Sequence, residues 1–126
     1  MYFFFDATFA PQISDILNLL DVKCCHLTAH FPKEALDEEW IPFASKEEWV
    51  AVTGDFKIWK NPLQRETIQS YRLKMVFMPD GFVNSKIWSQ VQYIIKYWPS
   101  IEDQLVKQRS WNRVRFNING KIEVLD

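Results

Sequence analysis

The sequence predicts an α/β fold: a three-layer α/β/α sandwich with a mostly parallel four-stranded sheet and a C-terminal β-hairpin. Short apolar runs typical of buried strands alternate with stretches whose apolar residues recur at helical spacing. This alternation is typical of a parallel sheet that is covered on both faces by helices. The chain has 126 residues, of which 48% are hydrophobic and 25% are charged, and this predicts that residues 1–126 form a single domain.

The first predicted elements are a strand, a helix and a second strand. Residues 2–5 are all aromatic and predict a buried strand that ends at Asp6. Apolar residues at helical intervals predict an amphipathic helix over residues 11–20. Residues 22–28 are prone to β structure and predict the second strand, which a loop follows.

The next two elements repeat this plan. Asp37 is a typical N-cap residue and predicts a helix over residues 38–47. Pro42 falls in the second turn of that helix, where its missing backbone N–H predicts a late start or a kink. Residues 49–53 are a third apolar run, which is closed by a polar turn, and they predict the third strand.

The remaining elements complete the sandwich and add the hairpin. They are predicted as a helix over residues 61–71, a strand over 73–78, helical stretches over 85–97 and onward to about 107, and a hairpin of residues 113–118 and 121–125. Pro99 is expected to separate the two helical stretches, because proline cannot donate a backbone hydrogen bond. Asn119-Gly120 is the turn signal of the hairpin.

Charge is unevenly distributed along a chain whose formal net charge is -1. Residues 1–55 hold ten acidic side chains against three lysines, whereas residues 56–126 hold twelve Lys and Arg against six acidic side chains. Such a division is expected where carboxylates hold a metal ion and nearby cations hold a polyanion. Two solvated surfaces of opposite sign produce the same pattern, so charge by itself leaves both interpretations open.

Acidic residues follow the first and third predicted strands and open the helix after the second. They are Asp6, Asp55 and Asp37, the last with its neighbours Glu38 and Glu39. In an open parallel sheet, sites lie at the carboxyl ends of the strands where the strand order reverses. Carboxylates gathered there repel one another unless a cation such as Mg²⁺ or Mn²⁺ neutralises them. We therefore expect these acids to hold a metal, and the structural alternatives are a helix cap for Asp37 and a turn for Asp55.

Three segments carry a resemblance to a known family. The run FFFDATFAP at residues 3–11 is a strand that ends in Asp shortly before a Pro that starts the helix. Residues 26–42 supply a second acidic position, and VAVTGD at residues 50–55 supplies a strand with a Thr-x-Asp motif. These segments resemble the PIN-like domain family, with specific motifs over roughly residues 3–65 and agreement only in layout beyond them.

The resemblance implies a fold and an activity. PIN-like domains are parallel α/β sandwiches whose acidic cluster binds Mg²⁺ or Mn²⁺ and hydrolyses RNA phosphodiesters, as in the VapC-type toxins of bacterial type II toxin-antitoxin pairs. The resemblance therefore assigns Asp6, Asp37 and Asp55 as catalytic metal ligands, with Glu38 or Glu39 in support. The implied partners are an RNA substrate and an antitoxin protein. Any exposed part of the aromatic-rich C-terminal third, which contains Trp88, Trp98 and Trp111, would form a surface for the antitoxin or for a second copy of the chain.

This sequence departs from the family pattern at the site. Thr8 stands where many relatives carry Asn, and the usual fourth acidic residue has no counterpart other than Glu38 or Glu39. A reduced acidic cluster leaves an alternative open. The chain is then a catalytically degenerate PIN-like module that binds RNA or a protein partner without cleavage.

The candidate RNA-binding residues are Lys57, Lys60 and Arg65, which follow the last acidic motif closely. They are placed to contact the phosphates beside a cleavage site, and such contacts position RNA without selecting its sequence. The alternative is that they are ordinary exposed cations.

Other phosphate-handling folds match less well. A haloacid dehalogenase phosphatase needs a second Asp where this chain has Thr8, and a receiver domain needs an acidic pair that Ala7 breaks. No segment has the pattern of a signal peptide or the roughly 18 apolar residues that span a bilayer. We therefore expect a cytoplasmic protein without membrane contact.

Overall fold

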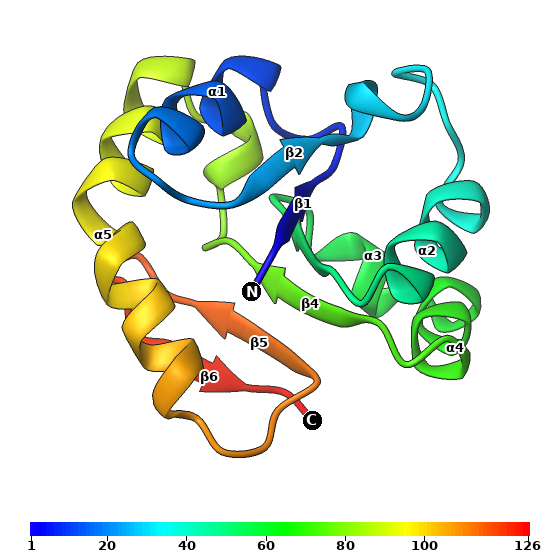
Figure 1. Ribbon diagram of the computed structural model, residues 1–126. Coiled ribbons are helices and arrows are strands. Elements are labelled where there is room, and N and C mark those ends of the chain that lie inside the picture. The colour runs from blue at the N-terminus through cyan, green and yellow to red at the C-terminus, as the bar shows by residue number, and fades with distance from the viewer.

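A computed structural model describes all 126 residues and contains one six-stranded sheet with helices on both of its faces (Figure 1). The order of the strands across the sheet is β2-β1-β3-β4-β5-β6. The strands are β1 (Phe3–Phe5), β2 (Cys24–His26), β3 (Val50–Thr53), β4 (Lys74–Phe77), β5 (Arg113–Phe116) and β6 (Ile122–Val124). This arrangement confirms the predicted α/β/α sandwich.

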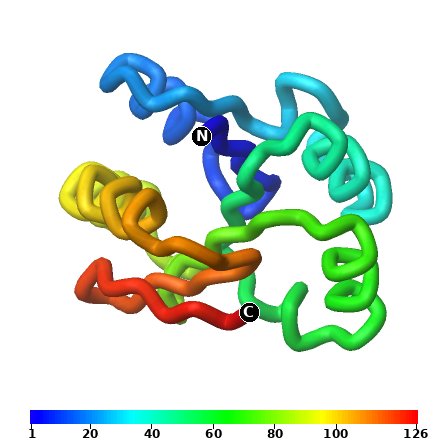
Figure 2. The backbone as a smooth tube through the Cα atoms, turned by 60° about the horizontal axis from the view of Figure 1, so that its bottom comes forward, coloured from blue at the N-terminus to red at the C-terminus, as the bar shows by residue number.

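The helices divide between the two faces of the sheet. They are α1 (Pro11–Leu19), α2 (Asp37–Lys46), α3 (Lys57–Lys60), α4 (Pro62–Ser70) and α5 (Ile87–Lys107), with 3-10 turns η1 (Leu27–Ala29) and η2 (Phe82–Asn84). In Figures 1 and 2, α1 and α5 lie on one side of the sheet, and α2, α3 and α4 lie on the other. None of these helices combines the length and the hydrophobicity that crossing a membrane requires.

The predicted hairpin is part of the main sheet. Strands β1 to β5 are all parallel to their neighbours, and only β6 pairs antiparallel, with β5. The sequence predicts four strands in the sheet and a separate hairpin. The difference arises because α5 carries the chain back across one face, so that β5 enters beside β4 in the same direction.

Each face of the sheet has its own hydrophobic core, because alternate side chains of a strand point to opposite faces. On the side of α1 and α5, Phe3 and Phe5 belong to a cluster of 18 buried residues. On the opposite side, Phe4 packs in a cluster of 12 buried residues with the ring of Trp40. The aromatic run at residues 3–5 therefore contributes side chains to both cores. This confirms the prediction that it is a buried strand.

Two prolines do not interrupt their helices. The sequence predicts a break at Pro99, but α5 runs without interruption from Ile87 to Lys107. Its inner side chains, including Ile94, Trp98 and Ile101, are buried against the sheet, and this packing offsets the one backbone hydrogen bond that proline cannot donate. Pro42 likewise lies inside α2, which starts at Asp37 without delay.

Some boundaries also differ from the prediction. The N-cap position of α2 is Leu36, so Asp37 is the first helical residue and its side chain does not cap the helix. Strand β2 ends at His26 and continues as the turn η1, so it is shorter than the predicted strand over residues 22–28. The short helix α3 lies where the sequence predicts no element, and its position beside the third strand matters for the site.

The topology creates one place where strand order reverses. From β1 the chain goes to β2 on one side, and then crosses to β3 on the other side of β1. A crevice therefore opens at the carboxyl ends of β1 and β3, which is where open α/β sheets commonly bind their ligands. Asp6 follows β1 directly, and Asp55 follows β3 after one residue.

Candidate active site

A pocket of about 170 Å³ lies at this crevice, and the three predicted Asp residues all line it. Asp6 comes from the end of β1, Asp55 from the end of β3, and Asp37 from the first turn of α2. Lys57 and Gln64 also line this pocket, which we call the acidic pocket. Residues far apart in the sequence meet here because parallel strands end at the same edge of the sheet.

Asp6 is a buried carboxyl, with a residue exposure of 7%. Burial raises its pKa to about 6, and the nearby carboxylate of Asp37 adds to the rise. Hydrogen bonds from the hydroxyls of Thr53 and Thr8 and from the Thr8 backbone act in the opposite direction. A buried acid with a raised pKa that lines a pocket is a candidate functional group.

Thr8 fixes the orientation of Asp6. Its backbone N–H donates to Asp6 Oδ1 at 3.0 Å, and its hydroxyl donates to the same oxygen. The Thr8 hydroxyl also accepts from the backbone N–H of Gly54 at 2.7 Å. Thr8 thus ties the segment after β1 to the segment after β3, and holds the two strand ends together at the site.

Both carboxylate oxygens of Asp37 have hydrogen-bond donors from the protein. The indole Nε1 of Trp40 donates to Oδ1 at 3.0 Å, and the Gln64 side-chain amide donates to Oδ2. Trp40 is buried, so one side of this carboxylate is held against the core beneath α2. Asp37 is therefore directed into the pocket by neutral donors rather than by a cation.

Asp55 is less constrained than the other two. Its backbone N–H donates to the Thr53 hydroxyl at 3.2 Å, and its Oδ1 accepts from the backbone N–H of Lys57 at 2.9 Å. The second interaction stabilises the start of α3. It corresponds to the structural alternative for Asp55, in which the side chain stabilises a turn. No hydrogen bond engages the other carboxylate oxygen, which remains available to a ligand.

The donor chemistry of the acidic pocket fits a hard divalent cation, although the acids do not form a ready three-carboxylate site. No three acidic, His or Cys side chains lie close enough together to hold one ion. Mg²⁺ commonly uses one or two carboxylates and keeps several water ligands, so a full triad is not required. Asp6 and Asp55 are the two acids on neighbouring strand ends, and they fit this mode best.

Glu38 and Glu39 do not line the acidic pocket. Both are exposed on the first turn of α2. Glu38 lines a separate pocket of about 250 Å³ between α2 and α4, and Glu39 accepts from the backbone N–H of Leu36 at 3.4 Å. Both acids lie at the N-terminal end of the helix, where negative charge is favourable.

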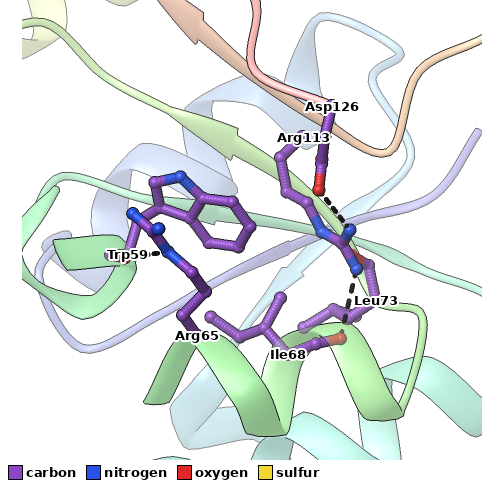
Figure 3. Close-up of polar contacts among 6 residues, drawn as sticks. All are labelled: Trp59, Arg65, Ile68, Leu73, Arg113 and Asp126. Atoms are coloured by element: carbon purple, nitrogen blue, oxygen red, sulfur yellow. Dashed lines mark hydrogen bonds and ion pairs between the residues drawn. The ribbon is translucent and has the colours of Figure 1, made fainter. Parts of the chain in front are cut away.

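The three predicted RNA-binding cations are not equivalent. Lys57 lines the acidic pocket and also a neighbouring pocket of about 210 Å³, which Lys60 shares. Arg65 lines neither. Figure 3 shows its guanidinium beside Trp59, where its Nε donates to the Trp59 carbonyl at 2.7 Å and its charge lies 4.6 Å from the ring centroid.

Sequence analysis does not identify three polar residues in this region. Gln64 lines the acidic pocket, and Asp80 and Arg115 line the neighbouring pocket of about 210 Å³. Gln64 is an ordinary helix residue until α4 packs beside α2. Asp80 comes shortly after the carboxyl end of β4, as Asp6 and Asp55 come shortly after the ends of β1 and β3. Its Pro-Asp-Gly context, however, predicts only a turn. Arg115 is near the site only because β5 is parallel to β4, which the hairpin pattern does not predict.

The two histidines have structural environments. His26 is buried, and its Nδ1 accepts from the Thr28 backbone N–H at 3.1 Å while Nε2 lies 2.8 Å from the Phe9 carbonyl. Through these two contacts the His26 ring links β2 to the segment before α1. His30 is exposed and stacks near Phe43, away from the acidic pocket.

Comparison with known protein families identifies a match over most of the chain. The family model of a PIN-like domain matches residues 1–80, which run from the N-terminus to the turn after β4. No curated protein and no solved structure matches the chain. The matched region includes all three acids of the acidic pocket and confirms the predicted family.

Proposed function

Because the chain belongs to the PIN-like domain family, we propose that it is a nuclease that cleaves RNA with the help of a divalent cation. PIN domains are generally dependent on divalent metals. The observation that carries the proposal is the acidic pocket, where Asp6, Asp37 and Asp55 meet at the switch point of the sheet. A cluster of carboxylates in a concave site is costly unless a cation or a proton neutralises it.

In this proposal Asp6 and Asp55 hold Mg²⁺ or Mn²⁺, and Thr8 keeps Asp6 in place through its two hydrogen bonds. When bound, the ion polarises a phosphoryl oxygen and lowers the pKa of the attacking water. Asp37 orients groups on the other side of the pocket. Lys57, which lines the pocket, contributes a positive charge against the phosphate.

We extend the proposal to a biological role, that of the toxin in a bacterial type II toxin-antitoxin pair. Family membership supports a nuclease activity, and in this role a protein partner would hold the nuclease inactive until it is released. Trp88, at the start of α5, has 76% of its surface exposed and offers an anchor for an antitoxin or a second copy. Expression in bacteria is expected to arrest growth, and Asp6→Asn is expected to abolish the arrest.

The activity is tested by incubating the purified chain with single-stranded and structured RNA in Mg²⁺, Mn²⁺ or EDTA. Asp6→Asn and Asp55→Asn keep the size of each side chain but remove its charge. We expect cleavage in either metal, none in EDTA, and a loss of roughly a hundredfold or more in each variant, since disturbing even the outer shell of a metal site typically costs 10- to 100-fold.

The matched control is Asp15→Asn, which removes one charge from an exposed Asp on α1 outside the pocket. It should cleave as the wild type does. Cleavage that persists in EDTA, or that is equal in all three variants, would show that the cleavage depends on neither the metal nor the acids of the pocket, and would overturn the proposal.

A second candidate function is RNA binding without cleavage. Two observations favour it: both oxygens of Asp37 already accept hydrogen bonds, and no three acids lie close enough together to hold one ion. Gel-shift measurements on the same RNAs separate the two candidates. RNA that is retained but intact in every metal would identify the binding module.

A further inference from the structure

We propose that the pocket of about 210 Å³ beside the acidic pocket binds the phosphate of the nucleotide next to the one at the acidic pocket, with Arg115 as its principal anion ligand. We call it the basic pocket. This inference rests on the proposed function, because it assigns the path of the RNA strand at the same site.

The two pockets are adjacent. Asp55 and Lys57 line both of them, so the segment that follows β3 contributes to the wall of each pocket. The basic pocket then extends across the carboxyl end of β4 to β5. A strand that leaves the acidic pocket in this direction enters the basic pocket next.

Cations outnumber acids in the basic pocket. Its charged lining residues are Lys57, Lys60, Arg115, Asp55 and Asp80. Lys57 and Lys60 are exposed on α3, so their charges are accessible. The acidic pocket has the opposite balance, with three carboxylates and one lysine. An anion is therefore favoured at the basic pocket, and a cation at the acidic one.

Arg115 is oriented toward the pocket before any ligand arrives. Its side chain is only 19% exposed, and its guanidinium lies 3.9 Å from the centroid of the Phe56 ring. Packing on an aromatic face fixes the plane of the guanidinium and reduces the entropy lost when it binds an anion. Lys60 lies at the same ring, 5.7 Å from its centroid.

The present partner of Arg115 can be displaced. One terminal nitrogen of the guanidinium donates to Asp80, and no other hydrogen bond of this side chain is formed. The side chain of Asp80 is 88% exposed, so it can rotate into water at little cost. The remaining donors of the guanidinium have the fork geometry that suits a phosphate.

The proposal is tested by anisotropy titrations of a fluorescent single-stranded RNA, with Ca²⁺ in place of Mg²⁺ and the RNA checked for integrity afterwards. Ca²⁺ takes the same oxygen ligands. We expect Arg115→Gln to weaken binding about tenfold, as the loss of one charge-assisted contact predicts. The slope of log affinity against log salt should also fall by about 0.7, the value for one phosphate of a single strand.

Two matched controls isolate the site from net charge. Arg109→Gln removes an exposed arginine before the amino end of β5, at the opposite edge of the sheet, and should change affinity by less than about twofold. Asp80→Asn frees Arg115 and should tighten binding about threefold, whereas Glu66→Gln, an exposed acid on α4, should not. The gain in Asp80→Asn keeps the test decisive even if Arg115→Gln folds poorly.

The outcomes also distinguish this inference from the proposed function. If the chain cleaves RNA but Arg115→Gln and Arg109→Gln bind alike, the subsite is wrong and the nuclease stands. If Arg115→Gln and Asp80→Asn shift binding as expected but no RNA is cleaved, the subsite stands and the nuclease is wrong. A wild type that binds no RNA, or that binds only inorganic phosphate in calorimetry, overturns the subsite for a nucleic-acid strand.

Discussion

Asp6 combines two demands that oppose each other. In its proposed role as a metal ligand it has to be ionised, and as a residue with 7% exposure at the end of an aromatic strand it is stabilised when neutral. Its folded-state pKa of about 6 lies above its ordinary value of 3.8. The folded state therefore binds the Asp6 proton more tightly than the unfolded state does. As a result, the free energy of unfolding decreases as the pH rises from about 4 to 6.

The first prediction is that Asp6→Asn stabilises the metal-free protein at pH 7. The pKa difference of about two units corresponds to about 3 kcal/mol in the free energy of unfolding. The variant should be more stable than the wild type by this amount at neutral pH, and should have no such advantage below pH 4. Urea unfolding in EDTA at pH 4, 5.5 and 7 measures this difference. Asp15→Asn is the control, and an equal pH dependence in Asp6→Asn and the wild type would contradict the raised pKa.

Arg113 shows that a buried charge can also be purely structural. Its guanidinium donates to the carbonyls of Leu73 and Ile68 at 3.1 and 3.2 Å and pairs with Asp126 at 2.9 Å (Figure 3). Three nitrogens thus have partners, and the group joins β5 to the end of α4 and to the chain after β6. Asp6 differs from Arg113 in that it lines a pocket, where a ligand can reach it.

At the scale of elements, the β5–β6 hairpin depends on close packing against α5. Gly120, in the hairpin turn, has a φ of 73°, and a Cβ at this position would overlap the ring of Tyr97. Gln104 of α5 adds two hydrogen bonds, to the Gly120 carbonyl at 2.7 Å and from the Ile122 N–H at 3.0 Å. The turn is therefore specified both by its backbone conformation and by the helix beside it.

The second prediction compares two glycines with similar backbones. Gly81 has a φ of 78° and no atom within 4 Å of a Cβ, so Gly81→Ala should cost about 1 kcal/mol of left-handed strain. Gly120→Ala adds the displacement of Tyr97 and should cost about 3 kcal/mol in total. Chemical denaturation measures both, and equal losses would show that the ring moves aside freely.

At the scale of the whole molecule, the region matched by the family model is not a complete structural unit. The match ends at residue 80, whereas eight of the 18 buried residues in the core beneath α1 and α5 come later in the chain. Without α5 and β5, α1 is the only helix that covers this face of the sheet, and the edge of β4 is exposed. Residues 81–126 are therefore needed to complete the hydrophobic core.

The third prediction is that a fragment of residues 1–80 does not fold. Loss of almost half of one core removes far more stability than the 5–15 kcal/mol by which domains of this size are usually stable. Near-UV circular dichroism and urea unfolding are the measurements, with the full chain as reference. A cooperative transition in the fragment would show that the remaining core suffices.

Features of this protein that depend on local pattern can be predicted from its sequence. An aromatic run of strand length, helical spacing of apolar residues and strands alternating with helices identify the α/β/α class, because each signal is complete within a few consecutive residues. Because the carboxyl ends of parallel strands meet at one edge of a sheet, the sequence also predicts that Asp6 and Asp55 lie close together.

Only the tertiary structure decides features that depend on residues distant in sequence. The direction of β5, which makes the sheet six-stranded and delivers Arg115 to the site, follows from the packing of α5 across one face. The uninterrupted path of α5 through Pro99 has the same cause. Gln64 reaches Asp37 only when α4 lies beside α2. In each case the deciding free energy comes from long-range contacts, which local sequence patterns do not contain.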